Sequence, residues 1–381
     1  MPEKEVNIYL DYLLRQVYSL HVKQKAPLPI ACTVCTASAR VLFFKNMVQT
    51  AVSTEAGAVL CPICGGHLAS EPNAVHCEDC HHEFPVEGGI PQLFWMNDWP
   101  SDKPDVTKVM QAFYEKTPFP NYDEFDSAEA LRLKARRGVF AKLLDEQIKF
   151  GSRILEVGCG TGQLSNFLGM TWGRTVVGAD ACLHSLQLAE NFRRENEING
   201  ARFLQMNLFR PVFPPESFDF VICNGVLHHT SDPYLGFQSI SKLVKRGGYI
   251  LIGLYNKYSR LATDFRRVWF KLSGDRMQFL DAQIRDRSQN IGRKQAWFQD
   301  QYKNPHESKH TFAEVQDWFQ KNGFEFTNSI PKCQGEEFAP DEKLFTPHSP
   351  GTSFQHFLVQ AGETLVGGRD GGFFISIGKR S

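Results

Sequence analysis

Beyond Gly151, short runs of apolar residues alternate with segments whose apolar residues recur every three or four positions. Short runs are typical of strands buried on both faces, and the wider spacing is typical of helices with one buried face. Strands and helices that alternate in this way form a parallel sheet covered by helices on both faces. The sequence therefore predicts an α/β fold. We expect strands at 153–157, 175–179, 202–205, 218–222 and 248–254, with helices near 162–169, 183–197 and 232–245.

The alternation stops at residues 256–310, which we interpret as an insertion. A helix should follow at 311–322, because Thr311 and Glu314 have the spacing of a capping box. Two further strands are expected, at 324–330 and 373–377.

The chain before the sheet has a different character. Apolar residues at 3–25 have helical spacing that ends before Pro27, and residues 58–95 are rich in cysteine, histidine and glycine. The sequence therefore predicts four parts. These are a helical segment at 1–57, a cysteine-rich unit at 58–95, linker helices at 96–150, and the α/β domain at 151–381 with its insertion at 256–310.

Charge and apolar content exclude several classes of protein. Lysine and arginine together number 42, as do aspartate and glutamate, so the whole chain is not a basic nucleic-acid binder and no DNA partner is expected. No apolar run approaches the roughly 18 residues of a membrane helix, and residues 1–9 are too polar for a signal peptide. We therefore expect a cytoplasmic protein without a membrane partner. Its ten cysteines should then be thiols or metal ligands.

A glycine-rich turn follows the first predicted strand. Glycines let the backbone turn sharply and approach a ligand closely, and here they alternate as G-x-G-x-G rather than the G-x-G-x-x-G of dinucleotide-binding proteins. Glu156 precedes them, and its carboxylate would repel a pyrophosphate but attract the ammonium group of a methionine. We therefore expect a cofactor that carries a methionine to bind at Glu156, Gly158, Gly160 and Gly162.

Polar residues also follow the next three strands. Asp180 ends the second strand, where a carboxylate can accept hydrogen bonds from both hydroxyls of a ribose. Asn207 and Leu208 follow the third strand, and an asparagine side chain can pair with an adenine edge. Asn224 follows the fourth strand. We expect these four residues to bind the same cofactor.

In this order and at these intervals, the motifs resemble those of class I S-adenosylmethionine-dependent methyltransferases, over residues 108–381. The resemblance implies a Rossmann-like, seven-stranded sheet whose last strand is antiparallel, and S-adenosylmethionine as the cofactor. It also implies an N-terminal lid that includes Tyr114 and residues 118–122. The family often has aspartate where this chain has Asn207. The alternative is a non-catalytic zinc-ribbon RNA-binding module or interaction module that retains a cofactor site.

Two histidines follow the fourth strand, near the position expected for the methyl group. Methyl transfer is a direct displacement, so the protein mainly aligns the reactants and excludes water. A base is needed only if the acceptor is a hydroxyl or a protonated nitrogen, and a neutral imidazole of His228 or His229 could take that proton. The alternative is that one histidine orients the substrate and the other packs.

The segment His306–His310 matches the H-E-x-x-H pattern of zinc proteases, but that pattern requires a helix. Pro305 precedes the segment and a helix cap, Thr311, follows it. We therefore expect a loop that forms a substrate-side wall of the pocket.

The cysteine-rich unit contains two C-x-x-C pairs separated by 12 residues. Two pairs can hold one tetrahedral Zn²⁺, and such a closed site is structural. The residues that follow, Glu83–Pro91, resemble the small zinc-ribbon activator of tRNA, rRNA and protein methyltransferases. Cys32 and Cys35 lack a second pair, so we expect buried thiols there. The zinc ligands should be Cys61, Cys64, Cys77 and Cys80.

The sequence leaves open whether the acceptor is RNA or a small molecule. Residues 257–294 contain ten lysines or arginines against four aspartates. This excess would attract an anionic acceptor, RNA first and a phosphorylated or nucleotide-linked metabolite second. The alternative is an ordinary solvated helix face.

Overall fold

The computed structural model describes residues 59–71, 73–99, 105–120, 127–281, 284–285, 291–365 and 372–381. The helical segment expected at 1–57, with Cys32 and Cys35, lies outside these residues. So do Asn121 and Tyr122 of the expected lid.

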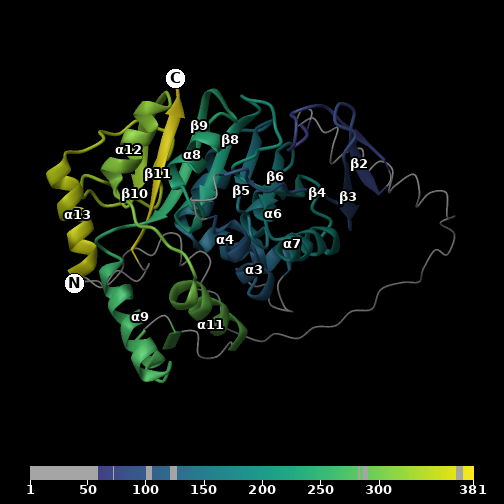
Figure 1. Ribbon diagram of the computed structural model, residues 1–381. Helices are drawn as coiled ribbons and strands as arrows, with labels where there is room; N and C mark the ends of the chain where they lie inside the picture. The colour runs from purple at the N-terminus through teal and green to yellow at the C-terminus, as the bar shows by residue number, and fades with distance from the viewer. Residues whose placement is uncertain are drawn as a thin grey trace, which may run out of the picture.

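Eleven strands of the described chain form one mixed sheet (Figure 1). Seven of them lie in the order β7-β6-β5-β8-β9-β11-β10, and β11 is antiparallel to both of its neighbours. The predicted Rossmann-like sheet with an antiparallel last strand is therefore confirmed. The strands are β5 (Arg153–Val157), β6 (Thr175–Asp180), β7 (Ala201–Met206), β8 (Phe218–Asn224), β9 (Val244–Tyr255), β10 (Phe324–Ile330) and β11 (Phe373–Arg380).

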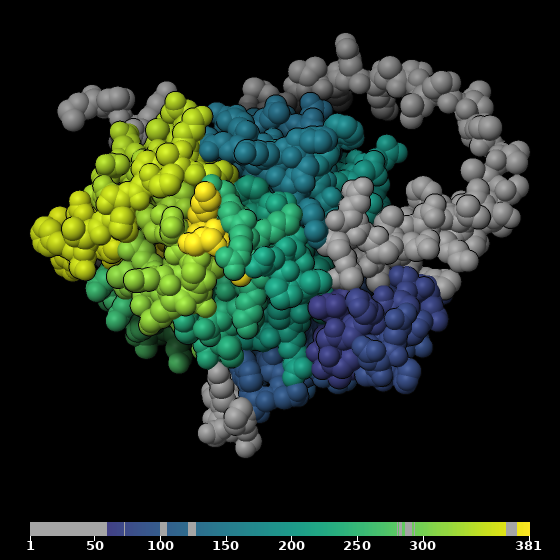
Figure 2. Space-filling model, turned by 90° about the horizontal axis from the view of Figure 1, so that it is seen from above, coloured from purple at the N-terminus to yellow at the C-terminus, as the bar shows by residue number. Residues whose placement is uncertain are grey.

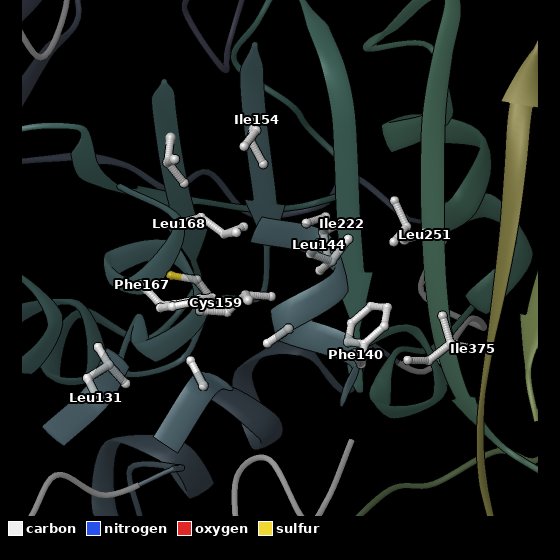
Figure 3. Packing of buried hydrophobic residues seen from close by; sticks show 14 of the residues in the cluster. Leu131, Phe140, Leu144, Ile154, Cys159, Phe167, Leu168, Ile222, Leu251 and Ile375 are labelled. Carbon is white, nitrogen blue, oxygen red and sulfur yellow. The ribbon is translucent and has the colours of Figure 1, made fainter. Parts of the chain in front are cut away.

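Helices cover both faces of this sheet. Neighbouring side chains on a strand point to opposite faces, and because both faces carry apolar side chains, both must be covered. Ile154 packs into one core and Leu155 into the other. Figure 3 shows the first core, where Phe140 and Leu144 pack with Ile222 and other strand residues. On that face lie α4 (Ala128–Arg137), α5 (Val139–Gln147), α6 (Gln163–Gly169) and α7 (Leu183–Glu195), and on the other lie α8 (Pro233–Ser241) and α12 (Phe312–Lys321).

One predicted helix is shorter than expected. It was predicted to reach residue 245 but ends at Ser241, because Val244 already pairs with Phe218 as the first residue of β9. The helix predicted at 311–322 is α12, and the Thr311 side chain accepts a hydrogen bond from the backbone N–H of Glu314, as the capping box requires.

The cysteine-rich unit forms a ribbon of four strands that continues the main sheet. The ribbon strands pair antiparallel with one another, and the last then runs parallel to β7, with Leu93 opposite Met206. Figure 2 shows this purple segment packed against the body of the molecule. The strands are β1 (Leu68–Ser70), β2 (Ala74–Cys77), β3 (Glu83–Glu87) and β4 (Ile90–Leu93).

Contacts outside the strands also hold the ribbon in place. The backbone N–H of Leu60 donates to the carbonyl of Val212 at 2.7 Å, and the Arg194 side chain donates to the carbonyl of Gly88. Because the ribbon pairs with β7, this edge of the main sheet is covered rather than exposed.

The insertion after β9 contains α9 (Leu261–Ser273), η2 (Gln278–Leu280), α11 (Ile291–Phe298) and one turn of π-helix, η3 (Gln299–Lys303). A last helix, α13 (Ser353–Leu365), precedes β11. Figure 1 shows α9 and α13 at the end of the molecule opposite the ribbon. Within the described parts of the chain, every helix is too short or too polar to cross a membrane.

The pairing of β4 with β7 generates a stability prediction. Leu93 is fully buried, so Leu93→Ala should lower the free energy of unfolding by about 2–5 kcal/mol in urea titrations followed by circular dichroism. Glu87→Ala, an exposed substitution on β3, is the control and should change it by less than about 0.5 kcal/mol. Equal stability of the Leu93 variant and the unmodified chain would show that β4 is not packed as described.

Candidate active site

One cavity opens at the carboxyl ends of β5, β6, β7 and β8, which is where open α/β sheets bind ligands. The structure brings most of the predicted site residues together there. Gly162 and His228 are the exceptions, because neither lines the cavity. The predicted residues that do line it are Glu156, Gly158, Gly160, Asp180, Asn207, Leu208, Asn224 and His229.

The three glycines of the turn have φ values of 70°, 53° and 71°, a region that favours glycine. A side chain on Gly158 would collide with Val226, and one on Gly160 would collide with the carbonyl of Phe119. A side chain on Gly162 would meet Phe203, so this last glycine serves the packing of α6 rather than contact with a ligand.

Asp180 connects the turn to the second strand. Its carboxylate accepts hydrogen bonds from the backbone N–H groups of Gly160 and Cys182, each at 2.8 Å. Burial raises the pKa of Asp180, although these hydrogen bonds act in the opposite direction. A carboxylate oxygen has more than one lone pair, so Asp180 can still accept hydrogen bonds from a ligand in the cavity.

Glu156 is buried and accepts a hydrogen bond from the hydroxyl of Ser165. Burial raises the pKa of Glu156 to about 8, so this carboxyl is mostly protonated at neutral pH without a ligand. A cationic ammonium group beside it would favour the ionised form.

The side chain of Asn207, which the sequence predicted to pair with adenine, already has hydrogen-bond partners within the protein. Its side-chain amide donates to the carbonyl of Trp95 and to the side chain of Asn97, each at 2.8 Å, and its oxygen accepts from the backbone N–H of Phe209. Both amide hydrogens are therefore used by the segment that follows the ribbon, and only the second lone pair of the side-chain oxygen is left for a ligand. Asn224 differs, because its side-chain oxygen is buried and has no hydrogen-bond partner among the described residues.

The described part of the expected lid lines the cavity. The helix α3 (Thr107–Lys116) supplies Met110 and Tyr114 to the lining. The side chain of Gln111 donates to the carbonyl of Ala181 at 2.8 Å, so α3 is attached to the end of β6.

The two histidines of η1 (Leu227–His229) have different environments. His229 lines the cavity, and its Nδ1 lies 2.7 Å from the carbonyl oxygen of His306. A carbonyl can only accept, so Nδ1 carries the proton and Nε2 has the lone pair in the neutral ring. Burial lowers the pKa of His229, which keeps the ring neutral at physiological pH.

His228 lies behind His229 rather than in the cavity. Its ring is fully buried between His229 and Tyr255, at centroid distances of 4.2 and 4.3 Å. Neither ring nitrogen has a hydrogen-bond partner among the described residues, and burial holds its pKa well below the usual value. The geometry assigns His228 to packing, in contrast to the catalytic role considered from the sequence.

The segment His306–His310 is a loop, as predicted, and it has no zinc-protease geometry. It does not line the cavity, so its predicted role as a substrate-side wall is wrong. It instead lies against the histidine pair, because the backbone N–H of Ser308 donates to the carbonyl of His228 at 2.7 Å.

A buried ionic network supports the side of the cavity that Tyr255, Asp300 and Gln301 line, and no sequence signal pointed to it. Arg260 is completely buried and donates to both carboxylate oxygens of Glu307, at 2.9 and 2.7 Å. Arg260 also donates to the side chain of Gln301 at 2.6 Å, and its guanidinium lies 3.7 Å from the ring centroid of Tyr255. Burial by itself raises the pKa of Glu307, but Arg260 and Arg267 outweigh it and lower that pKa to about 2.

This network positions residues of η3 that line the cavity. Gln301 donates to the hydroxyl of Tyr255 at 2.6 Å, and Asp300 accepts from the hydroxyl of Tyr114 at 2.9 Å. Asp300, Gln301, Tyr114 and Tyr255 all line the cavity. The insertion has no regular pattern, so Asp300 and Gln301 could not be recognised from the sequence.

The basic stretch at 257–294 is also less exposed than its composition suggested. Arg260 is buried and Arg267 contacts Glu307 at 2.6 Å. Glu307 lies outside residues 257–294, and it neutralises part of their positive charge. The excess of positive charge on this surface is therefore smaller than predicted.

The four cysteines of the ribbon form a cluster that suits one Zn²⁺. All four sulfur atoms lie within 4.8 Å of one another, and the Cys64–Cys77 and Cys61–Cys80 pairs are 3.4 and 3.7 Å apart. Zinc–sulfur bonds of about 2.3 Å place tetrahedral sulfurs roughly 3.8 Å apart. Backbone N–H groups of Ile63, Gly66 and Cys80 also point at the sulfurs, which stabilises thiolates.

Comparisons with known proteins agree with this geometry. Residues 155–252 match the family described as a methyltransferase domain. The ubiquinone biosynthesis O-methyltransferase of Paracidovorax citrulli is 32% identical over 111 residues, which are 29% of this chain and 46% of that protein. The uncharacterized methyltransferase YcgJ of Bacillus subtilis is 27% identical over 100 residues, which are 26% of this chain and 39% of that protein. The chain thus spans less than half the length of these curated relatives.

Among solved structures, the magnesium protoporphyrin IX methyltransferase of Synechocystis PCC 6803 with bound SAH is 14% identical. The alignment covers 72% of this chain and 96% of that one, with a TM-score of 0.41. The strand order, the glycine turn and the family match together show that this chain contains a class I S-adenosylmethionine-dependent methyltransferase domain.

The cysteine cluster generates a prediction about metal content. Protein purified without chelator should contain one zinc per chain by elemental analysis, and Cys77→Ser should lower that content because three thiolates leave the site open. Cys223→Ser, a substitution of a buried cysteine on β8, is the control and should leave zinc unchanged. Absence of zinc from the unmodified protein would contradict the assignment.

Proposed function

We propose that this chain transfers the methyl group of S-adenosylmethionine to a small-molecule acceptor held in the same cavity. The observation that carries the proposal is that one cavity joins the glycine turn and Asp180 to the side chain of His229. A cofactor site and an adjacent proton acceptor are the parts that methylation of a hydroxyl requires.

The cofactor half uses the turn and the ends of two strands. Asp180 accepts the ribose hydroxyls, and Glu156 binds the ammonium group of the methionine. Leu208, which lines the cavity after β7, packs against the adenine. When bound, S-adenosylmethionine supplies an electrophilic methyl group on a sulfonium.

The acceptor half lies between His229 and η3. His229 Nε2 takes the proton of the acceptor hydroxyl as the bond from its oxygen to the methyl carbon forms and the bond from that carbon to sulfur breaks. The carbonyl of His306 holds the imidazole in the required tautomer. Asp300 and Tyr114 offer hydrogen bonds that orient the acceptor, and α3 excludes water.

Two observations support a small acceptor over RNA. Residues of α3 form one wall of the cavity, and the basic stretch is partly neutralised by Glu307. The relative from Paracidovorax citrulli is named for O-methylation in ubiquinone biosynthesis, which also supports a hydroxyl on a small molecule.

Incubation with radiolabelled S-adenosylmethionine and cell extract tests the proposal. Label should appear in the small-molecule fraction and not in the RNA fraction. Asp180→Asn should weaken cofactor binding by about 1.5–3 kcal/mol in calorimetry, because hydrogen bonds to a charged group are lost. Asp317→Asn, on the exposed face of α12, is the control and should bind normally. Label in RNA alone would overturn the choice of acceptor, and unchanged affinity of the Asp180 variant would overturn its role.

The role of His229 is tested by the pH dependence of kcat/KM. The depressed pKa of His229 means that the basic form persists until the pH falls below its ordinary value of 6.5. At saturating S-adenosylmethionine, where the ionisation of Glu156 no longer limits cofactor binding, kcat/KM for the acceptor should therefore be constant above that pH and fall below it. His229→Asn retains an N–H that can reach the carbonyl of His306 but has no base, and kcat should fall about 10²- to 10⁴-fold.

His228→Asn serves as the matched control for this experiment. It should lower stability, because the ring is buried, but the fall of rate in acid should remain. If the His229 variant keeps both its rate and the acid limb, the base is another group.

A further inference from the structure

The helix α9 carries an apolar stripe on its outer face. The stripe follows the spacing of one helix face, and all five of its side chains are strongly exposed. They are Leu261 (56%), Phe265 (65%), Val268 (57%), Trp269 (42%) and Leu272 (76%).

The opposite face of α9 is anchored in the protein, which fixes the stripe outward. Phe270 is 1% exposed, and its ring lies 5.8 Å from that of Phe298 and 4.7 Å from that of Tyr302. Phe298 and Tyr302 flank the cavity residues of η3. Because the buried face is already packed, α9 cannot rotate its apolar stripe into this core.

Exposed apolar side chains also lie on α13. Phe354, Phe357 and Leu358 are 68%, 50% and 52% exposed, and the ring of Phe357 lies 6.0 Å from that of Tyr258, which precedes α9. Figure 1 shows both helices at the same end of the molecule. We call the stripe and these three residues the apolar platform.

Positive charges lie beside the α9 part of the apolar platform. Lys257, Lys271 and Arg276 are exposed, and none has an acidic partner within the described residues. The acid on α9, Asp264, is already paired with Lys309 and Arg267. The rim of the platform is therefore cationic although the whole chain has no net charge.

We propose that the apolar platform binds the surface of a bilayer that contains anionic phospholipids. A helix that has leucine, phenylalanine and tryptophan on one side and basic residues beside them lies in the plane of such an interface. The cationic rim complements anionic headgroups, whereas a second copy of the platform would bring like charges together. The platform thus differs from the sequence-based expectation of no membrane partner, which rested on the absence of a long apolar run.

The proposal is tested by co-sedimentation of the full chain with vesicles of phosphatidylcholine, with or without phosphatidylglycerol. The unmodified protein should bind the anionic vesicles. The triple variant Phe265→Gln, Val268→Gln and Leu272→Gln should reduce the partition coefficient about 100-fold, because three apolar side chains no longer enter the interface. Lys271→Gln with Arg276→Gln should reduce it about 30-fold on anionic vesicles only.

A matched control removes exposed aromatic rings elsewhere. Phe150 and Trp172 are 67% and 84% exposed, and Phe150→Gln with Trp172→Gln should leave vesicle binding unchanged. All variants should bind S-adenosylmethionine equally, which shows that they fold. Failure of the unmodified protein to bind vesicles, or normal binding by the triple variant, would overturn the proposal. A dimer that only the triple variant dissociates, without vesicle binding, would identify a second copy as the partner and also overturn it.

Discussion

The position of the cavity depends on one constraint, which is that parallel strands all end at the same edge of a sheet. The strands β7, β6, β5, β8 and β9 are parallel, and among the seven strands from β7 to β10 only β11 reverses direction. Side chains that are far apart in the sequence, from Glu156 to Tyr255, therefore line one cavity. The helices that follow the parallel strands also begin at this edge of the sheet. The glycine turn leads from β5 into one of these helices, α6.

The side of the cavity that Tyr255 and Gln301 line depends in addition on the buried guanidinium of Arg260. A buried charge is costly unless it is paired and hydrogen-bonded, and Glu307 and Gln301 fulfil both conditions. The pair connects the end of β9, η3 and the loop at 306–310, which in turn fixes the tautomer of His229. Because the pKa of Glu307 is lowered from its ordinary value of 4.5 to about 2, its contribution to stability is present above pH 4.5 and is lost as the pH falls through about 2.

The sheet could be predicted because local apolar spacing determines which segments become strands and helices. The cavity residues at Glu156, Asp180 and Asn224 could be predicted for the same reason, since each lies at the carboxyl end of a strand. The pairing of β4 with β7 could not, because a four-residue strand has no pattern that selects its partner. The correction at Asn207 follows from that pairing, which brings the backbone of Trp95 to its side chain.

In the insertion, the number of basic residues overstates the positive charge on the surface. Arg260 is one of ten basic residues in an apparently cationic stretch, yet its partner Glu307 lies 47 positions further along the chain. Burial and ion pairing at that separation depend on the tertiary fold, so composition overstated the exposed charge. Asp300 and Gln301 enter the cavity through a turn of π-helix that no periodicity predicts.

A crystal structure of the protein with S-adenosylhomocysteine tests the central claim most directly. The ribose should lie against Asp180, the amino group beside Glu156, and the sulfur should face Nε2 of His229 across the space for the acceptor. A nucleoside bound away from Asp180, or a sulfur that faces away from His229, would contradict the assignment of this cavity to methyl transfer.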